Sequence, residues 1–277
     1  MLIRSSQRSV DAPVFLGGDG EPVVLLHGAT MSWQVWEPML ASLVERHRVL
    51  APTLLAHIGN PAPTLVVTLD DLVDAVESEM DRAGFGTAHI AGNSLGGLVA
   101  MELARRGRAR SVFAISPAGG WTPEGGDGIS RKVANQQWAT RRVRRLIPFM
   151  MRFDWARRHA FRDVALRADK ISPAAAVTSL RATAAATIFE RITGVVVARA
   201  YGELGVPVLI AWPEEDRIIP LRPHGMGWRA LVPDARWIEI GGVGHVPMID
   251  EPDLVKRLLT DWIGAVKRST RTRQRAT

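Results

Sequence analysis

The chain has 277 residues, 47% hydrophobic and 23% charged, as expected for a globular protein of one large domain or two small ones. It contains no cysteine, which excludes disulfides, thiolate catalysis and cysteine-ligated metal sites. The formal net charge of +7 is concentrated in residues 120–203 and 266–277. This makes a weaker case for nucleic-acid binding than uniform basicity would, so no nucleic-acid partner is expected.

The first residues lack the long apolar core of a signal peptide. No run of about 18 apolar residues occurs in the sequence either. We therefore expect no membrane span and a cytoplasmic location.

Strand and helix patterns alternate along the first 118 residues. Residues 1–20 are polar and are expected to hold two short edge strands with a turn near Gly20. Beyond them, strands are predicted at 22–26, 48–51, 89–91 and 111–115, and helices at 38–45, 69–83 and 95–106. Thr68 is the expected N-cap of the second helix. Strands that alternate with helices predict a parallel sheet with crossover helices.

The alternation stops between residues 119 and 203, where only helical patterns occur. Helices are predicted there at 129–146, 152–169, 172–188 and 190–200. Strands return at 206–212 and 236–240, with helices near 223–232 and at 252–266. We predict a core made of 1–118 and 204–277, interrupted by a helical insertion at 119–203. The basic tail at 266–277 is expected to be disordered.

A single serine stands where a predicted strand turns into a helix, in the sequence Gly92-Asn93-Ser94-Leu95-Gly96. A serine nucleophile needs an exposed, strained hydroxyl, and glycines on either side let strand and helix approach closely. Chance supplies this pattern in about one comparable chain in ten. The alternative, a turn whose serine only caps a helix, therefore stays open.

Two later loops offer the partners that a serine nucleophile needs. His245 lies in a glycine-rich loop after the last predicted strand, and Asp216 follows the strand at 206–212. The carboxyl ends of parallel strands meet at one edge of a sheet. We therefore expect Ser94, Asp216 and His245 to converge as nucleophile, orienting acid and base.

The developing oxyanion also needs donors. The backbone N–H of Leu95, at the start of the helix after the serine, is one expected donor. The N–H of Ala29, directly after His27-Gly28 at the end of an early strand, is the other. His27 is expected to brace this loop rather than to act as a base.

Together these segments resemble the α/β-hydrolase superfamily, in its capped, esterase-like branch. The resemblance covers about residues 20–265 and is carried by Leu-Leu-His-Gly at 25–28, Gly-Asn-Ser-Leu-Gly-Gly at 92–97, Glu-Glu-Asp-Arg-Ile-Ile-Pro at 214–220 and Gly-His-Val-Pro-Met-Ile-Asp-Glu-Pro at 244–252. It implies an α/β-hydrolase fold, with a mostly parallel central sheet flanked by helices and a helical cap at 119–203. It also implies Ser94 as nucleophile, His245 as base and Asp216 as its orienting partner.

The chain departs from the family pattern in two places. Members often carry Asp-Leu-x-Gly-His-Gly after the second strand, where this chain has Thr-Leu-Leu-Ala-His-Ile-Gly at 53–59. Pro213 stands where a glycine usually precedes the acidic loop. Both departures are expected to reshape the rim of the pocket and to leave the three catalytic positions intact.

Comparison with members of the superfamily separates the possible activities. The haloalkane dehalogenases and epoxide hydrolases of this fold use an aspartate nucleophile, so Ser94 argues against both. The carbon–carbon hydrolases of aromatic degradation look similar at Gly-Asn-Ser-x-Gly-Gly. They typically carry His-Gly-x-Gly-Pro-Gly and often a tryptophan after the catalytic histidine, where this chain has His-Gly-Ala-Thr-Met-Ser and Val246.

The expected function is therefore hydrolysis of a carboxylic ester through an acyl-enzyme on Ser94. The alternatives are a carbon–carbon bond hydrolase of the meta-cleavage type and, from another class, a non-catalytic or weakly catalytic receptor for a small ligand. No cofactor and no metal are expected, and the expected partner is a small-molecule ester or acyl substrate. An apolar pocket is predicted around Trp33, Trp121, Met226 and Val246, with the plain core role as the alternative. The sequence leaves the oligomeric state open.

Overall fold

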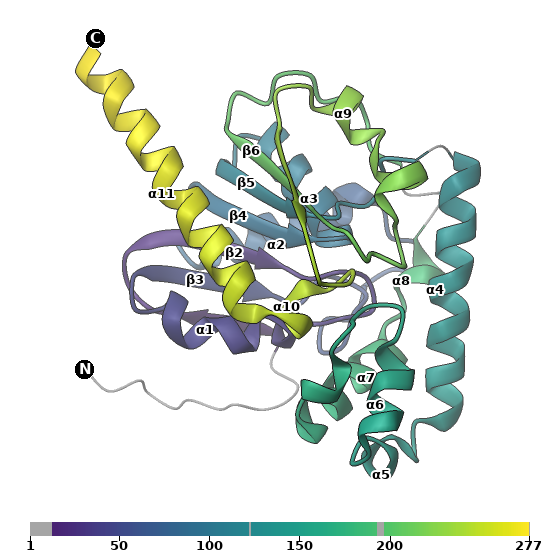
Figure 1. Ribbon diagram of the computed structural model, residues 1–277. Helices are drawn as coiled ribbons and strands as arrows, with labels where there is room; N and C mark the ends of the chain where they lie inside the picture. Colours follow the sequence, from purple (N-terminus) through teal and green to yellow (C-terminus); the bar gives the residue numbers. More distant parts are fainter. Residues whose placement is uncertain (1–12, 122, 193–196, 277) are drawn as a thin grey trace.

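The computed structural model describes residues 13–121, 123–192 and 197–276, and its centre is a seven-stranded sheet (Figure 1). The strand order is β1-β3-β2-β4-β5-β6-β7. The bounds are Val14–Gly17 (β1), Glu21–Leu26 (β2), His47–Pro52 (β3), Ala88–Asn93 (β4), Ala109–Ile115 (β5), Val208–Pro213 (β6) and Arg236–Ile240 (β7). β1 pairs antiparallel with β3, and all other neighbouring strands are parallel. The predicted, mostly parallel sheet is confirmed.

The edge strands predicted in residues 1–20 are confirmed only in part. β1 is one of them, and it lies beside β3. No second strand occurs in residues 13–20, and residues 1–12 lie outside the described part of the chain.

Helices cover both faces of the sheet (Figure 1). One face carries α2 (Leu69–Arg82) and α3 (Leu95–Arg105), and the other α1 (Glu37–Leu43) and α11 (Pro252–Ala276). In β2, Val24 and Leu26 point into the first hydrophobic cluster, and Val23 and Leu25 point into the second. A strand buried on both faces has to be apolar throughout, which explains the continuous hydrophobic run in this segment.

Thr68 caps α2, as predicted. Its Oγ1 accepts a hydrogen bond from the Asp71 N–H at 3.1 Å. The Asp71 carboxylate in turn accepts one from the Thr68 N–H at 2.8 Å. This reciprocal pair satisfies two backbone donors at the start of the helix and fixes where α2 begins.

Helices fill the segment between β5 and β6. They are α4 (Pro123–Val143), α5 (Ile147–Met150), α6 (Asp154–Phe161), the 3-10 turn η2 (Ala168–Lys170), α7 (Pro173–Ala185) and α8 (Ile188–Arg191). Ile147 in α5, Phe161 in α6 and Leu180 in α7 belong to one hydrophobic cluster within the insertion. Within its described residues the insertion contains no strand.

Two helices predicted in the insertion are too long. The one at 152–169 ends at Phe161, and the one at 190–200 is helical only to Arg191 within the described residues. The N–H groups of Leu166 and Arg167 donate to the Asp250 carboxylate, at 2.8 and 2.7 Å, instead of to helical carbonyls. Contacts with a residue 84 and 83 positions away therefore replace the helix here.

The helix predicted at 223–232 is broken into η3 (Leu221–Gly225) and α9 (Trp228–Leu231). Two glycines explain the break. A Cβ added to Gly225 would lie 2.5 Å from the ring of Trp212, and one added to Gly227 would lie 2.1 Å from the carbonyl oxygen of Gly120. The chain bends here because its backbone packs directly against other elements.

The C-terminal helix is longer than predicted. α11 continues to Ala276, so the tail expected to be disordered at 266–277 is helical as far as that residue. Lys267 forms an ion pair with Glu21, which ties the helix to the start of β2 beyond its predicted end. No helix of the described residues is long and apolar enough to cross a membrane.

β4 and α3 approach more closely than side chains would allow. A Cβ added to Gly92 would lie 2.2 Å from the carbonyl oxygen of Gly96. One added to Gly96 would lie 2.4 Å from that of Leu26 in β2. Both neighbours are backbone atoms that cannot rotate away, so only glycine fits at either position.

We predict that Gly96→Ala lowers the free energy of unfolding by about 3 kcal/mol or more, because the new methyl group displaces β2 backbone. Gly128→Ala is the matched control, since Gly128 is also helical and has no atom within 4 Å of an added Cβ. It should stabilise the protein by about 0.5–1 kcal/mol. Urea denaturation measures both, and equal effects of the two substitutions would contradict the tight packing.

Candidate active site

Ser94 occupies the turn between β4, which ends at Asn93, and α3, which begins at Leu95. Its φ of 55° and ψ of −117° form a conformation that residues with side chains rarely adopt. The Ser94 N–H donates to the carbonyl oxygen of Ile115 at 2.9 Å, and its own carbonyl accepts from the Ala118 N–H at 3.0 Å. The end of β5 and the loop after it therefore hold the strained turn in place.

Ser94 stands at the N-cap position of α3, but its hydroxyl makes no capping hydrogen bond to the helix. The alternative of a serine whose side chain caps the helix is therefore wrong. The residue is 8% exposed. Among the described residues its Oγ has no hydrogen-bond partner. The helix therefore leaves this hydroxyl unused.

The structure brings Asp216 and His245 together. Asp216 lies just after β6, and its Oδ2 accepts a hydrogen bond from His245 Nδ1 at 2.7 Å. Its Oδ1 accepts from the N–H groups of Ile218 and Ile219, at 2.9 and 2.7 Å. Both side chains are buried. With its proton on Nδ1, the imidazole has a lone pair on Nε2, as a base requires. Within the described ranges no group of His, Asp or Glu side chains could hold a metal ion.

Asn93 links the His245 loop to the serine turn. Its Nδ2 donates to the carbonyl oxygen of His245 at 3.0 Å, and the Asn93 side chain is fully buried. The residue directly before Ser94 therefore fixes the backbone of the histidine. The sequence offered a signal, since Asn93 lies inside the Gly-Asn-Ser motif, but the bond spans 152 positions and no local pattern predicts it.

Asp250 holds the other side of this loop and was also missed from the sequence. It is buried, and one carboxylate oxygen accepts from the Gly244 N–H at 2.8 Å. The other accepts from Leu166 and Arg167 in the insertion. One carboxylate thus orders the loop that carries His245 and fastens the insertion to it.

Two buried histidines brace the loop after β2. His27 Nε2 accepts from the Leu54 N–H at 2.9 Å, and His57 Nε2 accepts from the Thr30 N–H at 3.0 Å. Burial lowers the pKa of His57 to about 4, and burial together with the nearby His57 holds the pKa of His27 well below its ordinary value. Both rings are therefore neutral at pH 7, which leaves Nε2 free to accept. The predicted bracing role of His27 fits these bonds, and His57 is its counterpart.

The two predicted oxyanion donors lie beside Ser94. Leu95 is the first residue of α3, so its N–H has no acceptor within the helix. A Cβ added to Gly28 would lie 3.3 Å from the Ser94 Cβ, which places the loop that continues into Ala29 against the serine. The loop after β2 and the start of α3 therefore both lie against Ser94.

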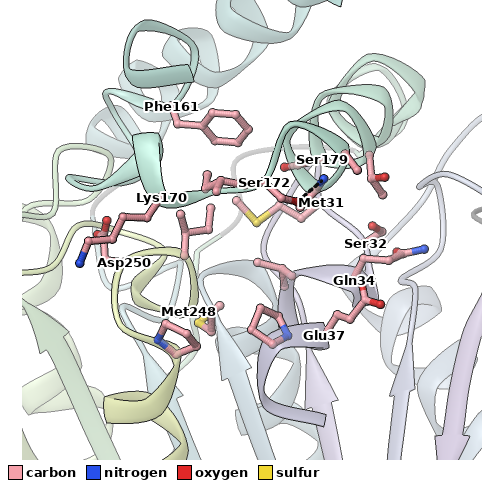
Figure 2. Close-up of a pocket in the computed structure, with 18 of the residues that line it drawn as sticks. Met31, Ser32, Gln34, Glu37, Phe161, Lys170, Ser172, Ser179, Met248 and Asp250 are labelled. Carbon is pink, nitrogen blue, oxygen red and sulfur yellow. Dashed lines mark hydrogen bonds between the residues drawn. The ribbon is translucent and has the colours of Figure 1, made fainter. Parts of the chain in front are cut away.

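A cavity of about 600 Å³ lies between the insertion and the core (Figure 2). Figure 2 shows Phe161 and Ser179 of the insertion facing Met31 and Met248 of the core. Met31 comes two residues after Ala29 in the sequence, and Met248 comes three residues after His245. Ser94, Asp216 and His245, the three predicted catalytic residues, are not among the residues that line the cavity.

None of the four residues predicted to line the pocket lines this cavity. Val246 is fully buried in the core cluster that includes α11. Trp33 packs on Phe15, with ring centroids 5.6 Å apart, and Trp121 lies edge-on to His224 at 6.4 Å. Met226 borders a different hollow, beside Arg229 and Glu239. Trp33 and Trp121 pack against the core clusters, which fits the alternative of a plain core role for both tryptophans. A contact of any of the four with substrate stays a prediction.

Residues 23–258 match the alpha/beta hydrolase family. The chain belongs to this family. The matched range contains Ser94, Asp216 and His245, together with the whole helical insertion between β5 and β6.

Three proteins illustrate the similarities of this alpha/beta hydrolase. Epoxide hydrolase EphH of Mycobacterium tuberculosis is 34% identical over 201 residues, which are 69% of this chain and 93% of that protein. The pimeloyl-acyl-carrier-protein methyl ester esterase of Aromatoleum aromaticum is 29% identical over 262 residues, 86% of this chain and 96% of that one. A thermophilic esterase from Thermogutta terrifontis, solved with malate bound, has a TM-score of 0.67 at 21% identity, covering 91% of this chain and 93% of its own. At that identity the structural likeness shows the fold alone.

Because buried His57 is held neutral, the stability of the fold should depend on pH in a specific way. The pKa of His57 is about 4 in the folded chain and near 6.5 when unfolded, so its stabilisation is complete above pH 6.5 and is lost as the pH falls to 4. We predict that the stability advantage of the wild type over His57→Gln shrinks by about 3 kcal/mol between pH 7 and pH 4.

Urea denaturation at each pH measures this difference. The exposed His159 serves as the control, because His159→Gln should show no such change between pH 7 and pH 4. A stability advantage over His57→Gln that stays constant with pH would mean that His57 is not held neutral.

Proposed function

We propose that this alpha/beta hydrolase cleaves carboxylic esters through an acyl-enzyme on Ser94. The observation that carries the proposal is a strained serine whose hydroxyl does not cap its helix, beside a buried aspartate–histidine pair. The 2.7 Å bond from His245 to Asp216 orients the imidazole and stabilises the positive charge that it would gain. The family and the esterases among its relatives support hydrolysis as the reaction class.

In the acylation step, His245 Nε2 takes the Ser94 proton as Oγ attacks the ester carbonyl carbon. The N–H groups of Leu95 and Ala29 stabilise the oxyanion, and His245 returns the proton to the departing alcohol. A water molecule then gives a proton to His245 and attacks the acyl-enzyme. Collapse releases the carboxylic acid and restores the Ser94 hydroxyl. The serine–histidine hydrogen bond, not formed in this structure, would form as substrate binds.

An apolar part of the substrate would occupy the cavity between insertion and core. Met31 and Met248 stand at its core side, close in sequence to the oxyanion loop and the base. Phe161 and Ile171 close it from the insertion. An ester whose carbonyl reached Ser94 would have an apolar chain long enough to extend past both methionines.

Ser94 disfavours epoxide hydrolysis, although EphH is a relative. An aspartate that opens an epoxide forms an ester, which water can cleave. A serine that did so would form an alkyl ether, which resists hydrolysis and would end turnover. Carbon–carbon cleavage and a receptor without catalysis remain alternatives, and both are separated from ester hydrolysis by the experiments below.

We predict that Ser94→Ala lowers kcat for p-nitrophenyl esters by at least about 10³-fold and abolishes labelling by a fluorophosphonate probe. Ser78→Ala, on the exposed surface of α2, should retain both. A wild type that the probe does not label would indicate a receptor. Full esterase activity in Ser94→Ala would contradict the proposed nucleophile, and faster turnover of a ring-cleavage dienoic acid than of any ester would favour carbon–carbon hydrolysis.

The cavity predicts how chain length affects the rate. Ala175 on α7 lines it, so Ala175→Phe should lower kcat/KM for p-nitrophenyl octanoate at least about tenfold by filling the space, with little effect on the acetate. Ala185→Phe is the matched control, because Ala185 is an exposed residue of the same helix outside the cavity. An equal effect of Ala175→Phe on both esters would show that the substrate lies elsewhere.

A further inference from the structure

Residues 138–155 expose an unusual number of large hydrophobic side chains. Ten such side chains are exposed among the described residues, and six of them lie in this stretch: Trp138, Val143, Leu146, Phe149, Phe153 and Trp155. Trp155 is 64% exposed and Phe149 is 60% exposed. A monomeric protein rarely leaves such a cluster in water unless it serves as a contact surface. We call it the 138–155 face.

Three of the four aromatic rings of this face pack on one another. Phe149 meets Phe153 edge-to-face at 5.5 Å, and Phe153 stacks on Trp155 at 6.3 Å. The face is built from the end of α4, the whole of α5 and the start of α6. Figure 1 shows α5 at the end of the molecule remote from the sheet. The face therefore belongs to a part of the insertion that lies at one end of the molecule.

The same face is strongly basic. It carries five arginines and one aspartate. Arg142, Arg144, Arg145 and Arg152 are exposed, and none has an acidic partner within the described part of the chain. The guanidinium of Arg142 lies 4.0 Å from the centre of the Trp138 ring. Trp138 and four of the arginines line a hollow of about 420 Å³, large enough for a phosphate group.

We propose that the 138–155 face docks this protein on the surface of a bilayer that contains anionic lipids. Trp and Phe rings next to arginines match the boundary between lipid headgroups and acyl chains, where the rings bury apolar area and guanidinium groups meet phosphates. The unpaired arginines give the face the charge opposite to that of anionic lipid. Val143 and Leu146 add aliphatic area that a bilayer can cover.

Other occupants fit the face less well. A second copy would bring two sets of unpaired arginines together, and their charges repel. A nucleic acid would satisfy the arginines but leave Val143 and Leu146 uncovered. The basic end of α11 does not extend this surface, because Figure 1 shows it at the opposite end of the molecule from α5.

The test is co-sedimentation of the full chain with vesicles at about 0.1 M NaCl, where surface charges are screened only in part. Vesicles of phosphatidylcholine with about one quarter phosphatidylglycerol should bind the wild type, and more salt should weaken binding. Vesicles of phosphatidylcholine alone should bind it much less. Phe149→Ala/Trp155→Ala should weaken binding at least about tenfold, and Arg144→Gln/Arg145→Gln about 30-fold.

Arg46→Gln/Arg257→Gln is the matched control, because it removes two exposed arginines elsewhere and should change binding less than about threefold. Thermal unfolding checks that each variant is folded. Ser94→Ala should bind vesicles as the wild type does, so docking and catalysis can fail separately.

Three results would overturn the proposal. One is a wild type that does not bind anionic vesicles. The second is a loss in the control variant as large as in Arg144→Gln/Arg145→Gln, which would mean that only net charge matters. The third is a dimer that Phe149→Ala/Trp155→Ala dissociates without changing vesicle binding, which would make the face an interface between copies.

Discussion

The close backbone contact between β4 and α3 is the constraint on which the rest of the site depends. Gly92 and Gly96 approach so closely that a methyl group on either would meet main-chain atoms within 2.4 Å. That contact forces the chain to reverse over one residue, Ser94, with its φ at 55°. The strain leaves the hydroxyl at the apex of the turn, unused by the helix that follows. The strained turn thus keeps out of the helix the hydroxyl that we propose as the nucleophile.

The parallel strands β6 and β7 bring Asp216 and His245 to the same edge of the sheet as Ser94. A few buried hydrogen bonds then fix the loops that carry them. Asn93 binds the His245 carbonyl, and Asp250 binds the loop from the other side while it holds the insertion. The reciprocal bonds of His27 and His57 fasten the loop after β2. Each of these side chains is buried, where an unpaired polar group would be costly, so the bonds resist opening.

The sequence predicts what depends on local pattern. The buried strands, the Thr68 cap and the strand-end positions of Ser94, Asp216 and His245 follow from hydrophobic periodicity, turn residues and parallel topology. The sequence does not predict features set by distant contacts. The break in the helix after Pro220 depends on Gly225 lying against Trp212. The hydrogen bond from Leu166 to Asp250 spans 84 positions, and the one from Asn93 to His245 spans 152. The cavity depends on how the insertion packs on the core, which no local pattern specifies. None of the four residues predicted for the pocket (Trp33, Trp121, Met226 and Val246) therefore lines it.

The most direct test of Ser94 as the residue that carries the acyl group is rapid-quench mass spectrometry of the protein with a p-nitrophenyl ester, followed by peptide mapping. We expect an adduct with the mass of the acyl group on the peptide that contains Ser94, formed in the burst phase and decaying as the carboxylic acid appears. Turnover without an adduct, or an adduct on another residue, would contradict this role of Ser94.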